Sequence, residues 1–149
     1  MAEPSGSRRI RLRTELPGPP AAVFAALTEP DRLARWWGPH GFSLPEVELA
    51  LRVGGGYRFA MQPPAGEPFH VQGEFLEVAP PHRLVFTFRY EEPDPDDVET
   101  VVTVTLSARG AATRIFVEQE AFATEARRAL HEAGWSDSLD RLRTLLAAG

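Results

Sequence analysis

Glu77 and His131 are the side chains of this sequence best placed for acid–base chemistry. Glu77 follows Gly73 and Phe75 at alternate positions of a predicted strand, so its carboxyl group is expected to point toward the core. A buried carboxyl group has a raised pKa and can serve as a general acid or base. His131 lies one helical turn before Trp135 and is expected near the mouth of any cavity beneath that helix. The alternative for both is a structural role, with Glu77 bound to backbone or Arg and His131 exposed or hydrogen-bonded.

Other catalytic chemistries lack the residues that they need. The four histidines, His40, His70, His82 and His131, form no HxH or HExxH pattern, so the sequence predicts no bound metal. Cysteine is absent and all sixteen basic residues are Arg, which excludes thiolate chemistry, a lysine Schiff base and a lysine phosphate loop. Prolines interrupt the acidic run 91–97, which lacks calcium-loop spacing and is predicted to be a solvated hairpin end. No cofactor is expected.

The composition indicates a cytoplasmic globular protein. The chain has 149 residues, 43% of them hydrophobic, which fits one domain with a substantial core. A formal net charge of -5 and a pI of about 5.4 give no general attraction for nucleic acid or anionic membranes. No apolar run approaches the roughly 20 residues that span a bilayer. We expect a disordered tail at 1–7 and a single domain at 8–149.

The elements that must position these side chains follow from hydrophobic spacing and turn residues. Residues 9–13 alternate as a strand, and two short helices begin near Pro20 and Pro30. From Gly41 to about residue 117 the apolar spacing has period two, interrupted by Gly- and Pro-rich turns. Thr124 to Ala147 is predicted to be one long helix with Thr124 as its N-cap. The order favours an α+β fold, with a curved antiparallel meander of six to seven strands wrapped around the C-terminal helix.

Such a sheet is too wide for one helix to cover. A helix is about 10 Å across and strands are spaced about 4.8 Å apart, so the rest of the inner face is either filled by large side chains or left as a pocket. Gly134 suggests a close approach of the helix to backbone or ligand, because glycine weakens a helix interior. The large residues expected on the inner face are Tyr57, Phe59, Phe75, Phe86, Phe88 and Trp135, with Leu139 continuing the helical stripe.

Trp36 and Trp37 end the second short helix, where Gly38 and Pro39 turn the chain. Leu33 and Trp37 are four residues apart and share a helical face. We therefore predict that Trp37 is buried with Leu33, and that Trp36 is more exposed or lies at the rim of the cavity.

The chain resembles the START-like (SRPBCC, helix-grip) superfamily, in the branch related to the C-terminal domain of the activator of heat-shock protein 90 ATPase. The resemblance implies a hydrophobic cavity between the sheet and the C-terminal helix. Two positions depart from the pattern: Ala50 replaces a common Asp, which removes a pair with Arg52, and Gln119 replaces a common His. The segments that carry the resemblance are PAAVFAALT at 20–28, WWGP at 36–39, RVGGGY at 52–57, GEFLEV at 73–78 with Pro80-Pro81, LVFTF at 84–88, TRI at 113–115, and Gly134-Trp135 with Leu139 and Leu142.

Three functions are compatible with this resemblance. The first is binding of a small hydrophobic molecule, either a lipid, an aromatic compound or a polyketide-like compound. The second is a cyclase- or hydrolase-like enzyme that uses Glu77, His131, Arg58 or Gln119 in the same cavity, and the third is a chaperone ATPase activator. A homodimer through an edge strand or the acidic hairpin is left open. The expected ligand-binding residues are Trp36, Trp37, Tyr57, Phe59, Phe75, Phe86, Phe88, Gln119, His131, Trp135 and Leu139.

Overall fold

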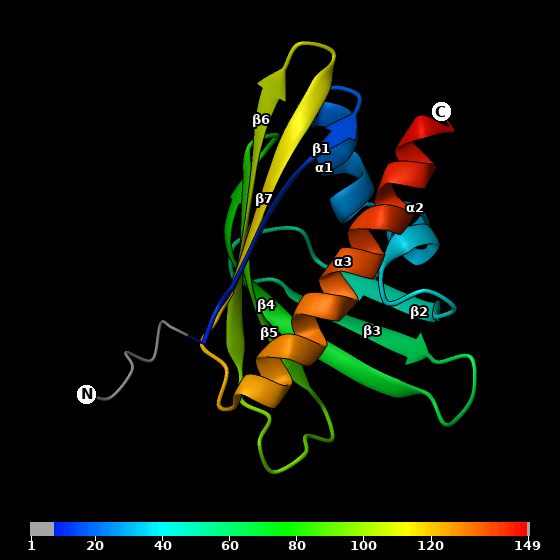
Figure 1. The fold of residues 1–149 in the computed structure, drawn as a ribbon, viewed down its shortest axis with the longest axis vertical. Helices are drawn as coiled ribbons and strands as arrows, with labels where there is room; N and C mark the ends of the chain where they lie inside the picture. Colours follow the sequence, from blue (N-terminus) through cyan, green and yellow to red (C-terminus); the bar gives the residue numbers. More distant parts are fainter. Residues whose placement is uncertain (1–7, 149) are drawn as a thin grey trace.

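The strands form one antiparallel sheet. A computed structural model describes residues 8–148, and within them the sheet has the order β1-β7-β6-β5-β4-β3-β2 (Figure 1). β2 to β7 follow one another as a meander, and β1 adds to the outer edge of β7. The strands are β1 (Ile10–Pro17), β2 (Ser43–Leu49), β3 (Gly56–Gln62), β4 (Phe69–Ala79), β5 (Arg83–Tyr90), β6 (Thr100–Arg109) and β7 (Ala112–Glu120).

Three helices pack on one side of this sheet. The long helix α3 (Glu125–Ala147) crosses the sheet face, and α1 (Pro20–Thr28) and α2 (Pro30–Trp36) lie near its C-terminal half (Figure 1). The side-chain oxygen of Thr124 accepts a hydrogen bond from the backbone N–H of Arg127, which confirms the predicted N-cap. The arrangement is the predicted α+β helix-grip fold.

A β-bulge in β4 changes which face its side chains occupy. Phe75 pairs with Phe86, but Glu77 pairs with Val85, so Leu76 is one extra residue in the ladder. Before the bulge Phe75 faces the core; after it, Glu77 moves to the opposite face. The prediction that the Glu77 carboxyl group points inward is therefore wrong, because strict alternation does not hold across the extra residue.

The glycine run before β3 packs against this bulge. The N–H of Gly54 donates to the Phe75 carbonyl, and the N–H of Phe75 donates to the Gly55 carbonyl, each at 2.8 Å. A Cβ atom on Gly55 would lie 2.1 Å from the carbonyl oxygen of Ala50, so no larger residue fits there. The run forms a tight turn and a bend of the sheet.

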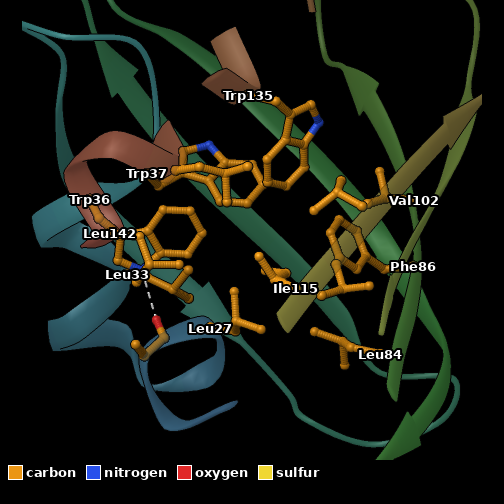
Figure 2. Packing of buried hydrophobic residues seen from close by; sticks show 14 of the residues in the cluster. Leu27, Leu33, Trp36, Trp37, Leu84, Phe86, Val102, Ile115, Trp135 and Leu142 are labelled. Carbon is orange, nitrogen blue, oxygen red and sulfur yellow. Dashed lines mark hydrogen bonds between the residues drawn. The ribbon is translucent and has the colours of Figure 1, made fainter. Parts of the chain in front are cut away.

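The core joins the sheet, both short helices and α3. Figure 2 shows side chains from all of these elements converging, with Trp37 between Leu33 and Trp135. Leu142 of α3 and Val102 and Ile115 of the sheet are almost fully buried within it.

The predicted tail at 1–7 lies outside the described residues. None of the helices in the described part of the chain is long and apolar enough to cross a membrane.

Candidate functional site

A pocket of about 180 Å³ lies between α3, the turn after α2 and the inner face of the sheet. Most of its lining is apolar or aromatic, and Leu130 at its edge is exposed, so the pocket reaches the surface. The lining residues are Trp37, Gly38, Pro39, Phe42, Met61, Phe69, Phe88, Tyr90, Gln119, Leu130, His131, Gly134, Trp135 and Ser138.

The prediction for the two adjacent tryptophans is borne out for Trp37 and wrong for Trp36. Trp36 is fully buried, and its indole N–H donates to the carbonyl of Ala26 at 2.8 Å (Figure 2). Trp37 is buried beside Leu33, as predicted, and also lines the pocket, with its ring 5.6 Å from that of Trp135. The prediction for Trp36 is wrong because Leu33 lies three residues before Trp36 as well as four before Trp37, and both spacings place residues on one helical face. The end of α1 then covers Trp36.

The turn after Trp37 forms one wall of the pocket and is held by α3. Nη1 of Arg141 donates to the carbonyls of Trp37, Gly38 and Pro39 at 3.2, 3.0 and 3.1 Å. The N–H of Gly38 donates to the hydroxyl of Ser138 at 3.0 Å. Gly38 has φ +102°, a left-handed conformation that favours glycine. Hydrogen bonds from Arg141 and to Ser138 of α3 therefore hold this wall in place.

A buried polar chain fixes Trp135 on the opposite wall. The Trp135 indole N–H donates to Oε1 of Gln119, and Nε2 of Gln119 donates to the hydroxyl of Thr100, each at 2.8 Å. Gln119 is 1% exposed. Both ends of its amide are already engaged by protein, so its predicted role as a ligand-bonding group competes with its role in positioning Trp135.

Tyr90 and His131 form a further polar contact in the lining. The Tyr90 hydroxyl lies 3.3 Å from Nε2 of His131, and the His131 ring also packs against Phe88 and Phe122. Burial lowers the pKa of His131 to about 4, so the ring is neutral at pH 7. Burial likewise raises the pKa of Tyr90 to about 12. The pair is uncharged at neutral pH.

The acidic loop between β5 and β6 is docked next to this pair. Arg127 of α3 forms ion pairs with Asp94, Asp96 and Asp97, and the Thr124 hydroxyl contacts Asp96 at 3.1 Å. The expected solvated hairpin end is therefore tied to the start of α3. The guanidinium of Arg127 holds the pKa of the Asp96 carboxyl group below its usual value through a hydrogen bond.

The predicted ligand-binding residues divide into two groups. Trp37, Phe88, Gln119, His131 and Trp135 line the pocket. The others pack in the core, where Trp36, Tyr57, Phe59, Phe75 and Phe86 surround only a small void of about 20 Å³, and Leu139 is buried on α3. For this second group, the geometry supports a role in filling the core rather than in lining a ligand pocket.

The candidate polar residues for catalysis are not brought together. Glu77 lies at the surface with its carboxylate 3.0 Å from Nε of Arg83. Arg58 pairs with Glu91, with Nε 2.5 Å from the carboxylate. Neither residue lines the pocket, and only His131 and Gln119 of the predicted polar set do.

Several lining residues were missed by the sequence reasoning. Tyr90 continues the alternation of Phe86 and Phe88, so the pattern could have included it. Phe42, Met61 and Phe69 come from separate segments that only the folded chain brings together.

The fold and pocket define the chain as a START-like helix-grip protein. The family described as activator of Hsp90 ATPase homolog 1-like protein matches residues 17–147, and the chain belongs to this family. No curated protein matches the chain significantly.

Solved bacterial structures share the whole architecture. A protein of Chromobacterium violaceum is 29% identical with a TM-score of 0.85, over 94% of this chain and 97% of that one. A Nitrosomonas europaea protein is 30% identical with a TM-score of 0.79, over 94% of each chain. A Silicibacter pomeroyi protein of the same family name is 29% identical with a TM-score of 0.82, over 94% and 98%.

Proposed function

We propose that the chain binds a small, predominantly apolar ring compound in the pocket between α3 and the sheet. The observation that carries this proposal is the aromatic lining of the cavity of about 180 Å³, which reaches the surface beside Leu130. Apolar pockets with a few placed polar groups are the usual form of small-molecule sites.

The cavity volume restricts the ligand size. An apolar cavity of about 150 Å³ in another protein accommodates benzene, whereas pockets for drug-sized ligands span about 300–1,000 Å³. The volume here of about 180 Å³ fits one ring with small substituents. Within the expected classes, a single-ring aromatic compound is favoured over a lipid or a multi-ring polyketide, which would require Trp37 or Trp135 to move.

Binding is favoured over catalysis by the composition of the lining. The lining contains no Asp, Glu or Arg, and the candidate acid Glu77 is paired with Arg83 at the surface. A cyclase or hydrolase needs a group that gives or takes a proton near the substrate. With its pKa lowered to about 4, His131 is a weak base for that task at pH 7.

A cavity-filling substitution tests the proposal, with toluene as the probe. A Cβ atom at Gly134 would meet Pro39 at 3.9 Å, an ordinary contact, and Gly134 lines the pocket, so we expect the side chain of Gly134→Leu to extend into the pocket. We expect calorimetry to show toluene binding to the original chain with a Kd of about 0.1–1 mM, and at least about tenfold weaker binding to Gly134→Leu.

Ala133→Leu is the matched control, because Ala133 is the exposed neighbour of Gly134 on the same helix. It should leave toluene binding unchanged. Equal affinity of Gly134→Leu and the original chain, or no binding by the original chain, would refute the proposed function.

A further inference from the structure

The polar groups of the pocket differ in their remaining hydrogen-bonding capacity. The Ser138 hydroxyl accepts from Gly38, and the Gln119 amide is bonded at both ends. Three groups of the lining keep unused capacity with respect to residues 8–148: the Trp37 indole N–H, the O–H of Ser138, and the pair formed by Tyr90 and His131.

The Tyr90–His131 pair can offer both a donor and an acceptor. A neutral imidazole has one N–H and one bare nitrogen, and a phenol hydroxyl both donates and accepts. If the Tyr90 hydroxyl donates to Nε2, then the Nδ1–H of His131 and a lone pair of Tyr90 remain. If Nε2–H donates to Tyr90, then the Tyr90 O–H and bare Nδ1 remain. The Tyr90 hydroxyl can therefore accept from a ligand in the first tautomer and donate to it in the second, whereas Nδ1 lies on the other side of the ring and cannot reach the same ligand atom.

The free nitrogen of His131 is not fully enclosed. Every fully buried side-chain nitrogen or oxygen of the described residues has a hydrogen-bond partner. Nδ1 of His131 has none among them, so it is not fully buried. The 3.3 Å contact with Tyr90 is also longer than the usual hydrogen bond, which lets the pair rearrange around a third group.

The surrounding charges disfavour an anionic ligand. The charged groups that act on His131 are Asp97 of the β5–β6 loop and Arg127 of α3. Arg127 is itself paired with three carboxylates, those of Asp94, Asp96 and Asp97, so negative charge is in excess at this end of the pocket. A carboxylate in the pocket would meet no cationic lining residue, and burial of an unpaired charge is costly.

Building on the proposed function, we infer that the ligand is an uncharged aromatic compound whose hydroxyl group is held by the Tyr90 hydroxyl, which His131 holds in place. A ligand hydroxyl both donates and accepts, so it can bond the Tyr90 hydroxyl in either tautomer of His131. A ketone can bond only where Tyr90 donates, and a hydrocarbon makes no such bond. The rings of Trp37, Phe88 and Trp135 pack against the aromatic part.

Three probes of similar size test this inference: p-cresol, toluene and p-toluate, titrated by calorimetry at pH 7.5. We expect p-cresol to bind about tenfold more tightly than toluene, the effect of one well-placed hydrogen bond, and p-toluate to bind more weakly than both. Tyr90→Phe should reduce the preference for p-cresol over toluene to about twofold or less, while toluene affinity is retained.

Tyr57→Phe is the control, since Tyr57 is the only other tyrosine and lies outside the pocket, with its hydroxyl bonded to the Thr87 carbonyl at 2.6 Å. It should keep the tenfold preference. Toluene binding as tightly as p-cresol, or a preference that survives in Tyr90→Phe, would overturn the inference while leaving the proposed function intact. Absence of binding by all three probes would overturn both.

Discussion

Trp36 replaces a backbone donor that α1 lacks. The Ala26 carbonyl would normally accept from the N–H four residues later, but residue 30 is proline and has no N–H. The indole N–H of Trp36 occupies that position at 2.8 Å while the ring itself is fully buried. Trp36 therefore joins the end of α1 to the end of α2, whereas Trp37 faces the pocket.

Replacement of each tryptophan by phenylalanine should separate these roles. Trp36→Phe leaves the buried Ala26 carbonyl unpaired and underfills the core, so we expect the free energy of unfolding to fall by about 2–3 kcal/mol. Trp37→Phe removes no hydrogen bond to a described residue and should cost about 1 kcal/mol. Urea unfolding of both variants measures the difference, and a larger loss for Trp37→Phe would contradict the assignment.

His131 should make stability depend on pH. Its pKa is lowered from 6.5 to about 4 by burial, so the unfolded chain takes up a proton at higher pH than the folded chain does. The contribution of the neutral, buried His131 to the free energy of unfolding is complete above about pH 6.5, and it is lost as the pH falls toward 4. The loss reaches about 3 kcal/mol, because each pKa unit corresponds to about 1.4 kcal/mol.

His131→Gln isolates this contribution from those of the other histidines. Urea unfolding at pH 7 and pH 4 should show a smaller loss of stability on acidification in His131→Gln than in the original chain. Identical losses in the two proteins would show that burial does not depress the pKa of His131.

Irregularities of the elements, which periodicity does not show, decide which way several of the predicted side chains point. Periodicity and proline positions predicted the strands, the two short helices and the N-cap of α3. Periodicity did not predict that Leu76 is an extra residue in β4, which turns Glu77 to the other face, or that the end of α1 covers Trp36. Both features depend on contacts with other segments.

At the C-terminal end of α2, Arg141 should be hard to replace. Both terminal nitrogens of its guanidinium contact backbone carbonyls, Nη1 those of Trp37, Gly38 and Pro39 and Nη2 that of Arg35 at 3.4 Å, and the single nitrogen of lysine cannot reproduce this fork. We expect Arg141→Lys to lower the free energy of unfolding by about 1–2 kcal/mol and to weaken toluene binding, because the wall formed by residues 37–39 loosens.

Arg143→Lys, two residues further along α3, is the control. Arg143 pairs with Asp140 at the surface and donates to the Thr14 hydroxyl of β1 at 2.7 Å, but it lies outside the pocket lining, so its replacement should cost about 0.5–1 kcal/mol and leave toluene binding unchanged. Thermal unfolding and calorimetry on both variants compare the two sites. Similar, small effects at the two positions would mean that Arg141 does not support the pocket wall.

For the whole molecule, the sequence motifs and their order along the chain were sufficient to predict the family and the fold. They could not separate rings that line the pocket from rings that fill the core. Phe86 and Phe88 have the same strand spacing, yet Phe88 lines the pocket and Phe86 packs around the smaller void. That division depends on where α3 and the turn after Trp37 lie over the sheet, which no local pattern specifies.

A crystal structure of the chain grown with toluene tests the central claim most directly. Our account predicts the toluene ring in the pocket between Trp37, Phe88 and Trp135, with Trp36 and the Tyr57–Phe86 cluster unchanged. A pocket closed by its own side chains, with toluene absent or bound elsewhere, would contradict the account.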